Sequence, residues 1–93
     1  MIQPTIGRIV LYYPGGKTQV DKEEQPFAAQ IAYVHSDRMV NLGFLDHRGQ
    51  SGAQTSVCLV QDGEPLPEHG FCCWMPYQIQ QAAEQEKPAK KGK

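Results

Sequence analysis

The chain has 93 residues, which fits one small domain, and 40% of them are hydrophobic. With 20% charged residues and a net charge of -1, it lacks both the high net charge of a disordered chain and the excess of Lys and Arg that attracts nucleic-acid phosphates. Nucleic acid is therefore not expected as the main partner. No apolar run approaches the roughly 20 residues of a membrane-spanning helix, and the N-terminus lacks signal-peptide features, so we expect a cytosolic protein with no membrane partner.

Three strands are predicted in the first half of the chain. Residues 5–13 are rich in β-branched and aromatic side chains, and they stop at a Pro-Gly-Gly turn sequence over residues 14–16. Residues 17–25 are polar and predict an exposed, mobile loop. Residues 26–35 and 39–46 then alternate apolar and polar positions, the period-2 pattern of a strand. The side chains expected on the inward face are Phe27, Ala29, Ile31 and Tyr33 in one strand, and Val40, Leu42 and Phe44 in the other.

Two further strands and a helix are predicted in the second half. Residues 47–54 contain two glycines and no core-forming side chain, which predicts a loop before a strand over residues 55–61. Residues 62–70 hold two prolines and two glycines and predict a turn-rich connection. The remaining predictions are a short strand over residues 71–76 that ends at Pro76, a short helix over 77–86, and a basic, structureless tail over 87–93.

Short strands separated by frequent turn signals predict a mostly β fold. We expect a small antiparallel five-stranded barrel, SH3-like or similar, with a short C-terminal helix and a disordered basic tail; a split sheet capped by the helix is the alternative. The barrel domain is expected over residues 1–80 and the helical extension and Lys-rich tail over 81–93. Because so short a chain has a thin core, a homo-oligomer is also expected.

The three cysteines do not predict a disulfide framework, a metal site or a cofactor. An odd count argues against paired disulfides, and two of the three, Cys72 and Cys73, are adjacent. Neighbouring side chains on a strand point to opposite faces, so these two thiols cannot readily bind one metal ion. We expect one of them to be a small core residue and the other to be partly exposed.

No group of residues predicts an enzyme. Asp46 and His47, like Glu68 and His69, are sequence neighbours, and adjacent residues rarely reach the geometry in which an acid orients a catalytic base. The serines lack the strand-turn-helix context of a nucleophile elbow. The sequence therefore predicts no catalytic residues.

Binding has more support, from aromatic rings and planar cations. Trp74 and Tyr77 are expected to supply stacking surfaces, because Pro76 ends the last strand and frees its neighbours for the surface. Most other aromatic side chains are expected in the core. Arg8 and Arg48 are expected to add charge. Asn41 is expected either to satisfy backbone groups or to contact a ligand. The predicted ligand-binding residues are Arg8, Asn41, Arg48, Trp74 and Tyr77.

Five short motifs in a fixed order resemble those of small uncharacterised proteins encoded by tailed bacteriophages and prophages. They are IGRIV (6–10), PFAAQI (26–31), VNL (40–42), TSV (55–57) and WMPYQ (74–78). The chain differs from that pattern at Cys72, where such proteins often have a first tryptophan. The resemblance implies a phage origin and carries over no catalytic residue.

A phage origin predicts a protein of the host cytoplasm that binds and neutralises a host component. The expected ligand is a small host-derived molecule, such as a signalling nucleotide that is sequestered to counter antiphage defence. The alternatives are a virion decoration or connector protein that contacts phage or host proteins, and a small nucleic-acid-binding barrel.

Overall fold

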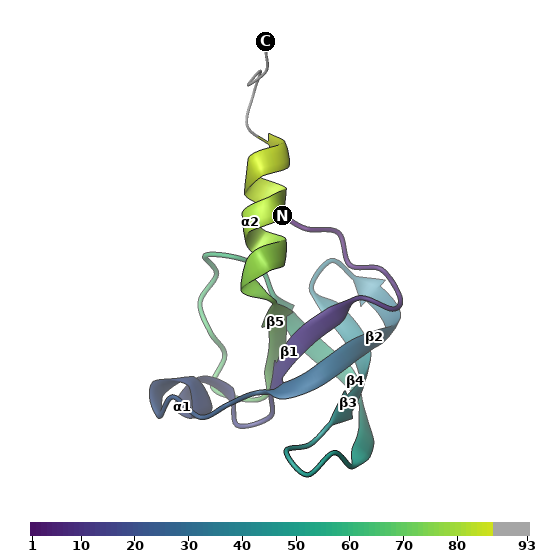
Figure 1. Ribbon diagram of the computed structural model, residues 1–93, viewed down its shortest axis with the longest axis vertical. Helices are drawn as coiled ribbons and strands as arrows, with labels where there is room; N and C mark the ends of the chain where they lie inside the picture. Colours follow the sequence, from purple (N-terminus) through teal and green to yellow (C-terminus); the bar gives the residue numbers. More distant parts are fainter. Residues whose placement is uncertain (87–93) are drawn as a thin grey trace.

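The computed structural model describes residues 1–86, which form a closed five-stranded barrel with two helices (Figure 1). The predicted mostly β fold, the barrel and the short C-terminal helix are confirmed, whereas the predicted basic tail lies outside the described residues. In chain order the elements are β1 (Ile9–Tyr13), α1 (Gly16–Asp21), β2 (Phe27–Ser36), β3 (Met39–Leu45), β4 (Ser51–Val60), β5 (Phe71–Trp74) and α2 (Pro76–Glu86).

The strands follow one another around the barrel in chain order, and the barrel closes between β5 and β1. Four of the neighbouring pairs are antiparallel, and β4 with β5 is parallel. Directions cannot alternate around a ring with an odd number of strands, so one pair has to be parallel. The barrel is thus mostly antiparallel, as predicted, with one parallel pair. Closure leaves the barrel without a free edge to pair with another strand.

A β-bulge changes the inward face of β2 halfway along its length. Ile31 pairs with Leu42 but Tyr33 pairs with Asn41, so Ala32 is an extra residue on β2. The alternation therefore shifts by one position, and Tyr33 is 53% exposed. The prediction that Tyr33 faces inward is wrong for this reason.

The core fills the barrel with side chains from all five strands. Val40 and Leu42 are buried as the alternation predicted, and Phe44 packs half-buried against them. The Phe44 ring stacks on Phe27, with centroids 5.5 Å apart, and lies across Gly52, where a Cβ would come within 2.7 Å of the Phe44 ring. The buried core residues are Val10, Tyr12, Ala29, Ile31, Val40, Leu42, Val57, Leu59, Cys72 and Trp74.

The chain forms regular structure in two places where a loop was predicted. Residues 16–21 form α1, which is held by the buried Gln19: its side-chain oxygen accepts from Gly15 N at 2.9 Å and its nitrogen donates to Gln25 O at 2.8 Å. β4 begins at Ser51, because Gly52 pairs with Phe44, and only residues 46–50 form the turn before it.

The C-terminal helix α2 projects from one end of the barrel, beside the N-terminal arm (Figure 1). Pro76 occupies its first position, and the Gln78 side chain accepts the Met75 N–H at 2.9 Å, which caps the helix start. Ile79 packs against the core. Neither described helix is both long enough and apolar enough to cross a membrane.

Candidate functional site: a groove on the outer face of the barrel

The outward side chains of β1 to β4 fall into two parallel rows. One row crosses the sheet from Ile9 through Gln30 and Gly43 to Ala53, and the next runs from Leu11 through Ala28 and Leu45 to Ser51. Residues that pair across strands share a face, so these rows are set by register and not by position in the sequence. Gly43 contributes no side chain to the middle of the first row.

Gly43, which has no side chain, lines a groove of about 460 Å³ on this face. A Cβ at Gly43 would meet no atom within 4 Å, which shows that the space above it is open. Ile9 and Leu45 remain 40% and 48% exposed. We call this hollow the outer groove; the outward residues that line it are Ile9, Ala28, Gln30, Ala32, Gly43, Leu45 and Ser51.

The outer groove is apolar, with a few uncharged polar groups. Gln30 donates its side-chain N–H to the Gly7 carbonyl at 3.0 Å, which fixes the amide and leaves its oxygen as an acceptor. The Ser51 hydroxyl lies on the same lining. None of the lining residues carries a charge. The groove can therefore hold an uncharged group and offer it both an acceptor and a hydroxyl.

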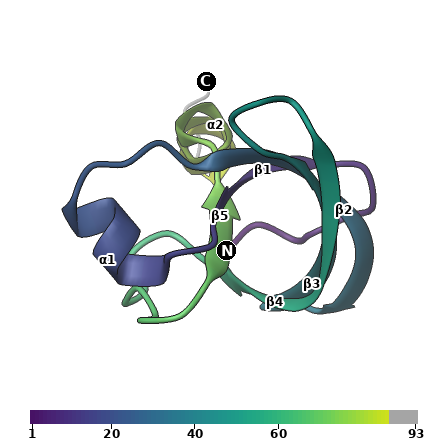
Figure 2. The same ribbon diagram turned by 90° about the horizontal axis from the view of Figure 1, so that it is seen from below.

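The helices leave this side of the barrel open. In both views α1 lies beside β5, on the opposite side of the barrel from β2 and β3 (Figures 1 and 2). α2 leaves from the end of β5 and points away from the barrel. The outer groove thus lies on a face that no described helix covers.

The structure brings only two of the predicted ligand-binding residues together. The Arg8 guanidinium carbon lies 5.6 Å from the centroid of the Trp74 ring, within the range of a cation–π contact. Trp74 itself is only 2% exposed, and its Nε1 donates to the Gln61 side chain at 3.0 Å. The prediction that Trp74 lies at the surface is therefore wrong: the indole fills the core, and Arg8 covers it.

Asn41 of β3 forms hydrogen bonds to both neighbouring strands, β2 and β4, close to a register shift in each. Its side-chain oxygen accepts from Ser56 N at 2.8 Å and from His35 Nε2 at 2.9 Å. β4 has an extra residue opposite Asn41, and Ser56 there has a positive φ of 54°. Asn41 thus satisfies a backbone donor at a β-bulge, the structural alternative that the sequence left open.

Tyr77 and Arg48 are both exposed, at opposite ends of the barrel. Tyr77 is 54% exposed at the start of α2, as predicted. Arg48 lies in the turn at the far end, where its backbone N–H donates to Asp46 Oδ1 at 2.9 Å (Figure 1). The two side chains therefore do not share one site, but the Arg48 turn joins the two groove residues Leu45 and Ser51.

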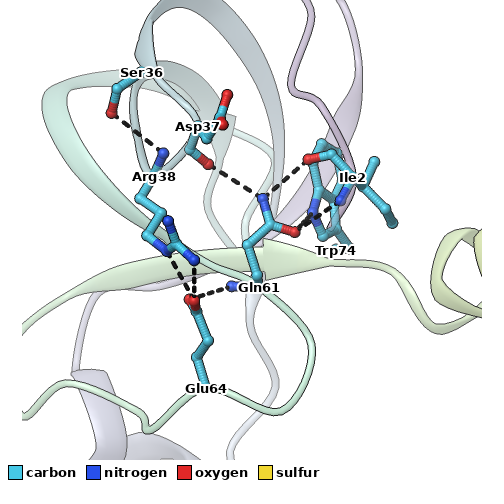
Figure 3. Close-up of polar contacts among 7 residues, drawn as sticks. All are labelled: Ile2, Ser36, Asp37, Arg38, Gln61, Glu64 and Trp74. Carbon is cyan, nitrogen blue, oxygen red and sulfur yellow. Dashed lines mark hydrogen bonds and ion pairs between the residues drawn. The ribbon is translucent and has the colours of Figure 1, made fainter.

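A group of hydrogen-bonded polar side chains that was not predicted from the sequence surrounds Gln61, beside the N-terminal arm (Figure 3). We call this group the polar centre. The buried Gln61 amide donates to the carbonyls of Ile2 and Asp37, at 2.9 and 3.1 Å, and accepts from Ile2 N at 3.1 Å as well as from Trp74. Its backbone N–H donates to Glu64, which also pairs with Arg38 at 2.6 Å. All four hydrogen-bonding positions of the amide are used, so this centre is structural.

The adjacent thiols Cys72 and Cys73 are buried to different degrees, and the His47 imidazole contacts the backbone. Cys72 is fully buried and Cys73 half-buried, as predicted, and burial raises their pKa values to about 12 and about 11. Thiols with such pKa values stay protonated near neutral pH and are poor nucleophiles. His47 Nε2 contacts the carbonyl of Gln25 at 2.9 Å, so this imidazole joins two loops. Among the described residues no three His, Cys, Asp or Glu side chains gather closely enough to hold a metal ion.

Comparisons with protein-family models, curated proteins and solved structures give no match. The conclusions about function therefore rest on the geometry of this chain.

Proposed function

We propose that the protein acts by binding a small ligand, without catalysis, and that the outer groove is the binding site. The volume of the groove supports this proposal. At about 460 Å³ it falls within the roughly 300–1,000 Å³ of small-molecule sites, which are mostly apolar and carry a few polar groups that orient the ligand.

The lining indicates the chemistry of the ligand. Ala28, Ala32 and Gly43 form a surface of small residues, over which a flat ring can lie closely. The Gln30 oxygen can accept a hydrogen bond from a ring N–H, and the lining offers no charge to balance an ionised group. A neutral heteroaromatic ring with an N–H donor, such as a nucleobase, fits these properties.

Arg48 is proposed to extend this site toward a phosphate. It lies in the turn between Leu45 and Ser51, and it forms no ion pair with the described residues. Arg8 is less suited, because its guanidinium lies over Trp74. A guanidinium pairs well with phosphate oxygens. The ligand class to test is therefore a nucleotide whose base lies in the outer groove, and with the phage resemblance we propose capture of a host signalling nucleotide.

The test is thermal unfolding with nucleosides, mononucleotides and cyclic dinucleotides. A binding nucleotide is expected to stabilise the chain by about 2.7 kcal/mol at a hundredfold excess over its Kd. The variant Gly43→Val places a branched side chain in the middle of the groove, where an added Cβ meets no atom within 4 Å. Ala83→Val adds the same side chain at an exposed residue of α2, outside the groove, and serves as the matched control.

We expect stabilisation of the wild type and of Ala83→Val, and none of Gly43→Val. Arg48→Ala should weaken nucleotide binding about tenfold and leave nucleoside binding unchanged, since one phosphate contact is lost. If no nucleotide or nucleoside stabilises the wild type, or if one stabilises Gly43→Val equally, the proposal is wrong.

A further inference from the structure

We infer that a second copy of this chain covers the outer groove and closes the ligand site; this inference rests on the proposed function. A site that holds a small ligand firmly encloses about 70–90% of its surface. The outer groove supplies one side of such an enclosure, on a face that no described helix covers. No residue in the range 1–86 supplies the opposite wall, and we assign that wall to the second copy.

The exposed side chains around the groove are of the kind that interfaces bury. Ile9 and Leu45 line the groove and are each 40% exposed or more; Tyr33 does not line it, but it is 53% exposed further along β2. Of the six large hydrophobic side chains that are exposed in residues 1–86, two thus line the groove and a third lies on the adjacent strand β2. Such a grouping marks a contact surface better than scattered single residues do.

Charge favours a second copy over a nucleic acid or an anionic membrane. Charged residues make up 20% of the chain, yet none lines the groove. A neutral face can meet an identical face without repulsion between like charges. Nucleic acid or an anionic membrane surface would require a cluster of Lys or Arg at the contact, which this lining lacks. The closed barrel also leaves no free edge for strand pairing, so we place the contact between the side chains of two outer faces.

The area of the face predicts a weak dimer that the ligand strengthens. Four strands spaced about 4.8 Å apart, with seven residues at about 3.4 Å each, present on the order of 500 Å². A stable interface takes about 800 Å² from each partner. The free chain should therefore dimerise reversibly, and a ligand enclosed between two copies should shift the equilibrium toward the dimer.

Sedimentation velocity of the full chain, with and without a cyclic purine dinucleotide, tests the inference. We expect a reversible equilibrium between the 10.4 kDa chain and a dimer of twice that mass, shifted toward the dimer by the dinucleotide. Leu45→Lys places a charge on the face and should give a monomer. Ala32→Lys tests the same face independently, and Ile6→Lys makes a matched change at an exposed apolar residue that does not line the groove. Circular dichroism shows which variants keep the fold.

The outcomes separate the two proposals. A monomer at every concentration that still binds the dinucleotide overturns the second copy and leaves the proposed function intact. A dimer that persists in folded Leu45→Lys and Ala32→Lys also overturns it, because the contact then lies elsewhere. The second copy is supported if Leu45→Lys and Ala32→Lys are monomers and Ile6→Lys is still a dimer. If the wild-type dimer then binds no nucleotide or nucleoside, the proposed ligand is wrong.

Discussion

The end of the barrel at Gln61 and the outer face of β1 to β4 differ in how far their side chains are buried and hydrogen-bonded. At the end, the chain folds its N-terminal arm over Trp74 and satisfies every hydrogen-bonding position of the Gln61 amide (Figure 3). On the outer face, apolar side chains and the hollow at Gly43 stay open to solvent. The first region therefore stabilises the fold, and the second is the region that we propose for binding.

The largest expected effect comes from removing the polar centre. Gln61→Met keeps the size of the side chain but leaves the Trp74 N–H and the Asp37 carbonyl without their partner. Each unsatisfied buried group costs about 1–3 kcal/mol, so the free energy of unfolding should fall by about 3 kcal/mol. Urea unfolding measures this change. Gln54→Ala, at an exposed glutamine, should change it by less than about 0.5 kcal/mol, and equal losses in the two variants would contradict the role of Gln61.

A double-mutant cycle sharpens this point. Trp74→Phe removes the N–H that Gln61 accepts. If the two side chains act together, the loss in the double variant should be smaller than the sum of the single losses by about 1 kcal/mol. Additive losses would mean that the indole contributes by packing alone.

The next largest effect on stability is expected at Gly16, the first residue of α1. Gly16 has a φ of +67°, and a Cβ there would overlap the carbonyl oxygens of Glu68 and His69. Gly16→Ala should destabilise the chain by about 2–3 kcal/mol, since backbone strain and steric overlap add. Gly63 has a similar φ of +84° but open space around it, so Gly63→Ala should cost only about 1 kcal/mol. Thermal unfolding compares the two, and equal costs would contradict the close approach at Gly16.

A smaller effect is expected from the exposed ion pair beside Gln61. The hydrogen bond from Arg38, together with the backbone N–H of Gln61, lowers the pKa of Glu64 below its ordinary value of about 4.3. A lowered pKa in the folded state gives stability that is present above about pH 4.3 and is lost as the pH falls through the folded pKa. Glu64→Gln should therefore be less stable than wild type near neutral pH and equally stable in acid. A stability difference that does not change with pH would exclude this linkage.

The smallest effect on stability is expected at the groove itself. Gly43→Val adds a β-branched residue to a strand at a position where a Cβ meets no atom within 4 Å, so the free energy of unfolding should stay the same or rise by up to about 1 kcal/mol. Urea unfolding tests this directly. A loss as large as that of Gln61→Met would mean that the open face contributes to the fold, and the contrast between the two regions would fail.

The sequence predicted the strands well where local alternation decides their faces. Val40, Leu42 and Phe44 alternate within one strand, and all three pack inward. The prediction that Tyr33 faces inward was wrong because the bulge at Ala32 depends on pairing with β3. The local sequence pattern does not reveal that pairing. The helix α1 was missed because the contacts of Gln19 and the close approach of Gly16 to residues 68–69 hold a segment that is polar in sequence.

The candidate site was harder to predict than the fold. Large aromatic and charged side chains were predicted to bind the ligand, but the Trp74 side chain is buried in the core. The outer groove arises where a residue without a side chain, Gly43, lies between Gln30 and Ala53 in neighbouring strands. Gly43 was predicted to face outward, but its neighbours could be identified only once the register of the strands was known.

The most direct test of the binding claim is an amide NMR titration of the full chain with a cyclic purine dinucleotide. We predict that the largest shifts belong to Ala28, Gln30, Ala32, Gly43 and Leu45, and that the amides of Gln61 and Trp74 barely move. Shifts centred on Trp74 and Tyr77, or shifts that persist unchanged in Gly43→Val, would contradict the assignment of binding to the outer face.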